Sequence, residues 1–199
     1  KPRPLWEILF STHHTDIGLL YIISSIAFLM MGGALAMALR AELWMPGAQI
    51  IPTSTDFHRI FTVHGTNMLF LWILPFGSGV GNYLIPIMVR YHDMAWPKLN
   101  AVAFWMIPVA AAMIWIGFSD TGWTAYPPYS TIRAPGPAAD LWIFGAKILG
   151  ISSVLGAINF VVTILRCKHP DLPLMKMPLF SWSILITSLM IIVATPTFA

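Results

Sequence analysis

The sequence predicts an all-α fold, a polytopic bundle of transmembrane helices. Of the 199 residues, 57% are hydrophobic and 10% are charged, whereas about one quarter of the residues of a soluble domain are charged. Five apolar stretches reach the length of about 20 helical residues that crosses the hydrocarbon layer of a bilayer. They cover residues 17–39, 60–89, 99–119, 141–165 and 177–199. We expect residues 1–199 to form a single membrane domain.

Charged residues bound each stretch in turn. The first ends before Arg40, the second lies between Arg59 and Arg90, the third follows Lys98, the fourth ends before Arg166 and the fifth follows Lys176. Lys147 is the one charged residue inside the five stretches, and its long side chain is expected to snorkel to the interface. The five boundaries therefore agree with five separate membrane crossings.

The distribution of Lys and Arg predicts that the N-terminus lies inside. Seven of these residues precede the first span or lie in the loops after the second and fourth spans, against three on the opposite side. Cytoplasmic loops carry such an excess. The net charge of +3 therefore follows from membrane topology. We expect a lipid bilayer, and no nucleic acid, among the partners.

One histidine stands at membrane depth, where an unpaired polar group costs several kcal/mol. His64 lies about one helical turn inside the outer end of the second span. Its neighbour Gly65 lets a bulky group approach the helix, and imidazole is a natural ligand of haem iron. From the spacing alone, a hydrogen-bonded packing histidine remains the alternative.

A second polar group gathers toward the inner side. It consists of a carboxylate in the inner loop, amides on three spans and two hydroxyls deeper in the fourth span. These residues are Asp93, Asn82, Asn100, Asn159, Ser152 and Ser153. They offer hydrogen-bonding groups for a chain of water molecules. Ordinary interhelical hydrogen bonding by Asn and Ser is the alternative.

Seven short blocks of sequence carry a family resemblance. They cover residues 11–21, 39–47, 62–66, 81–86, 93–100, 122–128 and 152–160, and include Thr62-Val63-His64-Gly65-Thr66 and Asp93-Met94-Ala95-Trp96-Pro97. In this order they resemble the start of subunit I of the haem-copper terminal oxidases. The resemblance covers nearly the whole chain and implies its N-terminal five-helix portion, within a larger subunit of twelve helices.

For the outer half, the resemblance implies a haem site. His64 matches the axial ligand of the low-spin haem, of a-type or b-type, and Arg40 matches an arginine that hydrogen-bonds a substituent of that haem. Trp123 and Tyr126 match outer-loop residues near the haem propionates, although both also suit interfacial anchors. Glu42 and Gly47 resemble a peripheral cation site of some members.

For the inner half, the resemblance implies a D-type proton channel of the A-type branch. Asp93 matches its entrance acid. Asn82, Asn100 and Asn159 match its narrow neck, and Tyr21, Ser152 and Ser153 match positions further along. The sequence departs from the family pattern at His92, Ala101 and Ala103, which puts the water content of the channel and the efficiency of pumping in doubt.

The catalytic residues of the family lie beyond the fifth helix. We therefore expect no catalytic residue in this chain, and a high-spin haem and a copper ion to be held by the remaining part of subunit I. Further partners that the resemblance implies are subunits of the second and third types and an electron donor, which is cytochrome c, a copper protein or quinol. The expected location is a prokaryotic plasma membrane, with the mitochondrial inner membrane as the alternative.

The resemblance implies a respiratory oxidoreductase that reduces oxygen to water and couples this reaction to proton translocation. A relative that reduces nitric oxide shares the histidine ligand, but is not expected to carry the set of Asp93, Asn82 and Asn100. A transporter or channel without enzymatic activity, and an inactive fragment that serves as a scaffold, remain alternatives. Haem absorption distinguishes the transporter from the oxidase.

Overall fold

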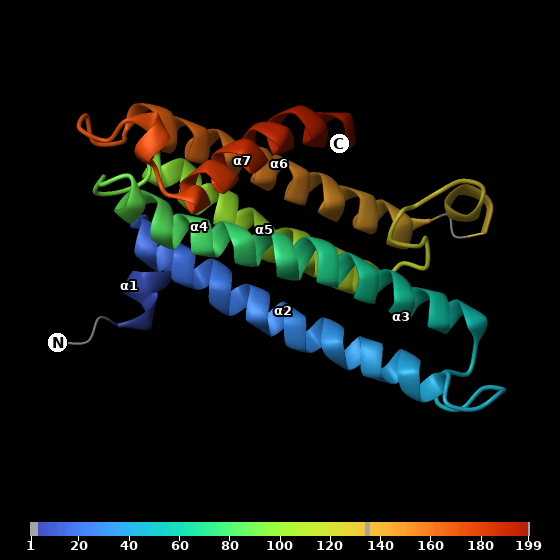
Figure 1. The fold of residues 1–199 in the computed structure, drawn as a ribbon. Helices are drawn as coiled ribbons and strands as arrows, with labels where there is room; N and C mark the ends of the chain where they lie inside the picture. The colour runs from blue at the N-terminus through green and yellow to red at the C-terminus, as the bar shows by residue number, and fades with distance from the viewer. Residues whose placement is uncertain (1–3, 134–135, 199) are drawn as a thin grey trace. The chain divides into compact units, whose positions relative to one another are not determined.

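A computed structural model describes residues 4–133 and 136–198, and over these residues every regular element is helical. The long helices, which Figure 1 traces in chain order, are α2 (His14–Glu42), α3 (Ser54–Thr66), α4 (Leu74–Met88), α5 (Pro97–Gly117), α6 (Pro137–Arg166) and α7 (Leu179–Phe198). The short ones are α1 (Leu5–Leu9), the π-helix η1 (Asn67–Ile73), η2 (Tyr129–Arg133) and η3 (Leu174–Lys176). The predicted all-α class is confirmed.

Five helices in the described part of the chain are long and apolar enough to cross a membrane. One of them runs without a break from Ser54 to Met88, through α3, η1 and α4, over 35 residues. It begins earlier than the apolar stretch because Thr53 caps it, with its hydroxyl oxygen accepting the Asp56 N–H at 3.1 Å. Hydropathy detects the apolar part of this helix and not its polar first turns.

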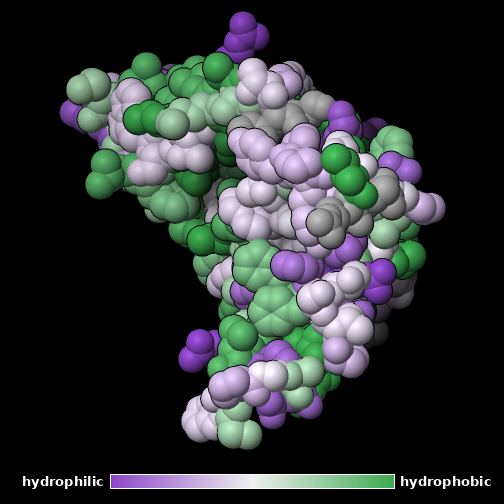
Figure 2. All heavy atoms as spheres, turned by 90° about the vertical axis from the view of Figure 1, so that its right-hand side faces the viewer, coloured by the Kyte–Doolittle hydropathy of each residue, from purple (hydrophilic) through white to green (hydrophobic). Residues whose placement is uncertain are grey.

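Large hydrophobic side chains are exposed on all the long apolar helices. Examples are Met37, Ile87, Ile116, Phe144 and Val193, which lie on α2, α4, α5, α6 and α7 and are 56–76% exposed. Figure 2 shows hydrophobic residues at the surface beside hydrophilic ones. Exposure on this scale is unfavourable in water and suits contact with hydrocarbon. Together with the five spanning helices, it identifies an integral membrane protein.

The chain forms two compact units. Unit 1 comprises Lys1–Ile23, Pro75–Ile107 and Ile148–Ala199. Its apolar core includes Ile85, Met94 and Ile164, all at most 2% exposed. Small residues bring its helices close, since a Cβ added to Gly79 of α4 would lie 2.8 Å from Cβ of Tyr21 on α2.

Unit 2 comprises Ser24–Leu74 and Pro108–Lys147. In it α5 and α6 approach through two glycines. A Cβ added to Gly145 would lie 3.0 Å from the carbonyl oxygen of Ala110, and one added to Gly117 would lie 3.0 Å from that of Ala138. Both helices therefore come near backbone contact, which favours association in lipid.

Candidate functional site

His64 has its ring fixed by a backbone carbonyl. Nδ1 lies 2.9 Å from the carbonyl oxygen of Gly32 on α2, within unit 2. A carbonyl oxygen only accepts, so Nδ1 carries the hydrogen and Nε2 keeps its lone pair. Metal-ligating histidines are oriented in this way. The arrangement therefore fits a ring that offers Nε2 to haem iron.

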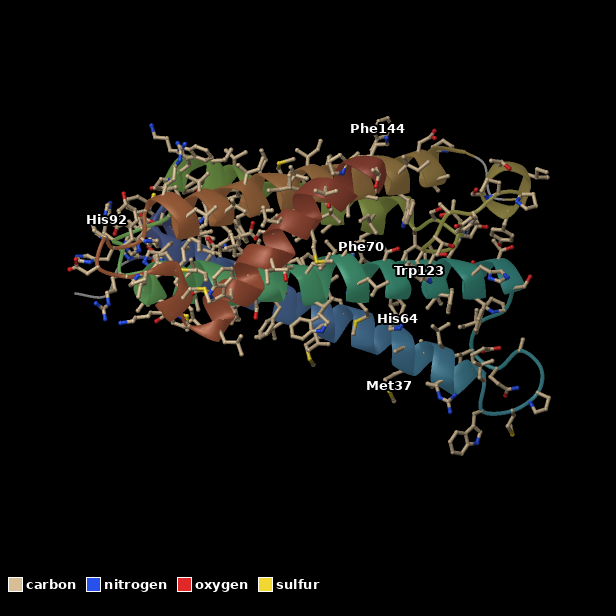
Figure 3. The ribbon with its side chains drawn as sticks, turned by 45° about the horizontal axis from the view of Figure 1, so that its top comes forward. Met37, His64, Phe70, His92, Trp123 and Phe144 are labelled. Carbon is tan, nitrogen blue, oxygen red and sulfur yellow. The ribbon has the colours of Figure 1, made fainter. Side chains whose placement is uncertain are left out.

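The bulky group that approaches Gly65 is an indole. A Cβ added to Gly65 would lie 3.2 Å from Cβ, Cγ and Cδ1 of Trp123, which is labelled with His64 in Figure 3. Trp123 is 39% exposed. The glycine after His64 thus makes room for this side chain, and Trp123 packs against α3 at Gly65.

A buried polar seam on α3 and η1 was not singled out from the sequence. Thr62, Thr66 and Asn67 are fully buried, and each accepts one hydrogen bond from another segment of unit 2. The donors are the N–H of Gly122 at 2.9 Å, Nε1 of Trp142 at 2.9 Å and Nε1 of Trp115 at 3.1 Å. The signal that could have found them is a polar residue inside an apolar span.

Arg40 and Tyr126 are two exposed residues of unit 2. Arg40 stands in the last turn of α2 and is exposed, and Tyr126 is 73% exposed. Among the described residues, no hydrogen bond joins either side chain to His64. The structure leaves both side chains accessible on the surface of unit 2.

Glu42 anchors the loop that follows α2. Its carboxylate accepts N–H groups from Gln49 at 3.1 and 3.2 Å, Ile50 at 2.7 Å and Ile51 at 2.8 Å. Gly47, with φ of 94°, shapes the turn. Cation sites need oxygens that face the ion, whereas these carboxylate oxygens face N–H donors. The cation site that the resemblance implies at Glu42 and Gly47 stays a prediction.

Asp93 caps the start of α2 within unit 1. Its Oδ1 accepts the N–H of His14 at 3.0 Å and the N–H of Met94 at 2.7 Å. The His14 ring is held as well, with Nδ1 2.9 Å from the carbonyl oxygen of Asn82. A carboxylate at a helix N-terminus is favoured by the helix dipole. Within the described part of the chain both hydrogen bonds of this carboxylate fall on Oδ1, so Oδ2 is the oxygen open to a proton.

Two amides of the predicted neck bind each other directly. Nδ2 of Asn100 donates to Oδ1 of Asn82 at 2.6 Å, and Nδ2 of Asn82 donates to the carbonyl oxygen of Ser78 at 2.9 Å. Asn82 and Asn100 are 2% and 1% exposed. The pair joins α4 to α5 in the interior of unit 1.

Asn159 engages backbone and not the amide pair. Its Oδ1 accepts the N–H of Trp96 at 3.0 Å, and its Nδ2 donates to the carbonyl oxygen of Trp96 at 3.3 Å. The Thr163 hydroxyl adds a bond from the N–H of Ala95 at 3.0 Å. Together Asn159 and Thr163 clamp the turn that precedes α5.

The remaining predicted path residues also lie in unit 1. Ser152 donates to the carbonyl oxygen of Ala103 at 2.6 Å and is hydrogen-bonded to the buried Tyr21 side chain. Ser153 donates to the carbonyl oxygen of Leu149 within its own helix at 2.9 Å. All seven predicted proton-path residues thus belong to unit 1, while all the predicted haem-side and cation residues belong to unit 2.

Known proteins resemble this chain over its whole length. The sequence model of the family described as cytochrome c and quinol oxidase polypeptide I matches residues 16–199. Cytochrome c oxidase subunit 1 of Synechocystis sp. is 42% identical over 100% of this chain and 37% of that protein. The subunit 1 proteins of Thermostichus vulcanus and Corynebacterium efficiens are 41% and 39% identical, over 96% and 98% of this chain. The chain spans about a third of the length of these relatives, 35–37%.

Proposed function

This chain belongs to the cytochrome c and quinol oxidase polypeptide I family, and from that membership we propose that it forms part of the catalytic subunit of a haem-copper terminal oxidase. The enzyme would reduce oxygen to water and move protons across the membrane. The observation that carries the proposal is the bond between Nδ1 of His64 and the Gly32 carbonyl. It leaves Nε2 as the ligating nitrogen.

In the proposed haem site, Nε2 of His64 would hold the iron of a low-spin haem of a-type or b-type. The haem contributes one-electron transfer when bound. Trp123 packs beside the ligand helix at Gly65 and restricts its movement. Arg40 and Tyr126, both exposed, are available to polar substituents of the group.

In the proposed proton path, Oδ2 of Asp93 receives a proton from the inner side. Oδ1 is held by two N–H groups, so the carboxylate keeps its orientation as it changes charge. The Asn82–Asn100 pair and the hydrogen-bonded Tyr21 and Ser152 offer polar groups for a water chain. Asn159 and Ser153 support this path by holding local backbone.

The rest of the enzyme follows from family membership. We propose that the remaining part of subunit I holds the high-spin haem and copper, and that further subunits and an electron donor complete the complex. The relatives are cytochrome c oxidases by name, which favours cytochrome c as the donor. The proposed location is a prokaryotic plasma membrane. In the proposed orientation, the N-terminus and Asp93 lie on the inner side of that membrane.

The proposal is tested with His64→Ala in the complete, purified oxidase. Reduced-minus-oxidised spectra should lose the low-spin six-coordinate haem, since the axial nitrogen is gone. His58→Ala is the matched control, because His58 lies on the same helix, is exposed and contacts the ring of Tyr129. A His64→Ala enzyme that keeps the low-spin band contradicts the proposed ligand.

A further inference from the structure

Asn67 places an amide in the apolar interior of unit 2. It is fully buried at the start of η1, three residues after His64. A buried amide left unpaired costs about 1–3 kcal/mol, and both ends of this one are paired. Nδ2 donates to the carbonyl oxygen of Phe28 at 2.6 Å, and Oδ1 accepts Nε1–H of Trp115 at 3.1 Å. The amide therefore connects α2, η1 and α5.

His64 and Asn67 hydrogen-bond to successive turns of α2. Their acceptors on α2 are the carbonyls of Gly32 and Phe28, which are four residues, or about one turn, apart. The two side chains stand about 4.5 Å apart along their own helix. Helical carbonyls keep a second lone pair, so each can accept a side chain without losing its backbone bond.

Gly32 makes this double contact possible. Its carbonyl receives His64, and a Cβ added to it would lie 2.6 Å from Nδ2 of Asn67 and 2.6 Å from Sδ of Met68. The Asn67 amide cannot move away from such a Cβ without breaking its hydrogen bonds to Phe28 and Trp115. The Asn67 amide thus occupies the space that a side chain at position 32 would fill.

We propose that Asn67 is a positioning residue for His64. Thr62 and Thr66 bond the helix that carries His64 to Gly122 and Trp142, but toward α2 a single hydrogen bond at Gly32 would not fix the rotation of this helix about that point. A second bond one turn along α2 fixes both the rotation and the sliding of that helix, and so the direction of Nε2. This inference rests on the proposed haem ligation by His64. Groups that orient a ligating imidazole also tune the metal that it binds.

The test is Asn67→Leu in the complete oxidase with all its subunits. Low-spin haem content should be retained, while the electron paramagnetic resonance g-values of that haem shift or split and its midpoint potential changes. Thr66→Val is the matched control. It removes a buried hydrogen bond of the same helix, to Trp142, without touching α2. It should keep the parental g-values.

Gly32→Ala provides a second, smaller change should Asn67→Leu fail to assemble. Its added methyl group displaces the Asn67 amide, so the g-values should shift as in Asn67→Leu. Parental g-values in either assembled variant overturn the positioning role, as does an equal shift in Thr66→Val. His64→Ala separates the two ideas. Loss of the low-spin haem in His64→Ala with parental g-values in Asn67→Leu rejects this inference and leaves the proposed ligand intact.

Discussion

The side-chain amide of Asn100 donates to Oδ1 of Asn82 across 2.6 Å, in a fully enclosed part of unit 1. Each amide serves as the other's partner, and Asn82 also donates to the carbonyl of Ser78. Removing one amide strands a polar group that water cannot reach. Removing both leaves an apolar contact of similar size. This asymmetry separates the structural role of the pair from its proposed role in proton transfer.

Asn100→Leu should destabilise the subunit by about 1–3 kcal/mol, because Asn82 loses its donor. The double variant Asn82→Leu with Asn100→Leu should recover much of that stability and still take up protons slowly. Thermal unfolding of the purified complex measures the first effect, and single-turnover proton uptake measures the second. Parental proton uptake in the double variant would assign the pair to packing alone.

Gly79→Ala should destabilise unit 1 by about 1–3 kcal/mol through overpacking. Its methyl group would lie 2.8 Å from Cβ of Tyr21 and 2.9 Å from Cγ1 of Ile22. Gly77→Ala is the control on the same helix, since nothing lies within 4 Å of a Cβ added there. The fraction of folded complex that survives graded heating distinguishes them. Equal survival of the two variants would contradict the close approach of α2 and α4.

Arg40→Met should leave the proposed low-spin haem bound and lower its midpoint potential, because a positive charge near a haem favours the reduced form. A charged hydrogen bond is worth about 1.5–3 kcal/mol, which corresponds to at most about 130 mV for one electron. Arg59→Met is the control, since Arg59 is exposed and pairs with Asp56 at 3.5 Å. Redox titration gives the potentials. A value for Arg40→Met equal to the parent would make Arg40 an interfacial cation.

The sequence was sufficient for the fold class because length and hydropathy dictate membrane crossings. It was less informative about the helix ends. The capped start at Ser54 depends on a hydroxyl at Thr53 and on polar turns that hydropathy scores as loop. The unit boundaries, which cut through α2, α4, α5 and α6, leave no mark in composition.

Candidate site residues could be named from the sequence where a single side chain would carry the chemistry, as with His64 and Asp93, and both assignments stay predictions. The hydrogen-bond partners of these side chains were not predictable, because they are backbone groups brought together by packing. The carbonyl of Gly32 and the N–H of His14 have no sequence signature. The role proposed for Asn67 could not be predicted either, because it depends on hydrogen bonds to Phe28 and Trp115, which are distant in sequence.

Asp93 has two roles that its substitutions can separate. Its Oδ1 holds the N–H groups of His14 and Met94, and its charge serves the proposed proton uptake. Asn keeps an oxygen acceptor at the same place and loses the titratable group. Ala loses both. The comparison of Asp93→Asn with Asp93→Ala therefore separates the cap of α2 from proton transfer.

Asp93→Asn should keep parental stability and an unchanged haem spectrum, with lower turnover and little or no proton release from reconstituted vesicles. Asp93→Ala should show the same proton defect and lose about 1 kcal/mol of stability, as expected for a lost helix cap. Asp171→Asn is the control, an acid 83% exposed at its side chain in the loop before α7, and should behave as the parent. Parental turnover together with parental proton stoichiometry in Asp93→Asn would reduce Asp93 to the cap alone. The polar side chains of Asn82, Asn100, Asn159 and Ser152 would then serve only to hydrogen-bond the helices to one another and would take no part in proton transfer.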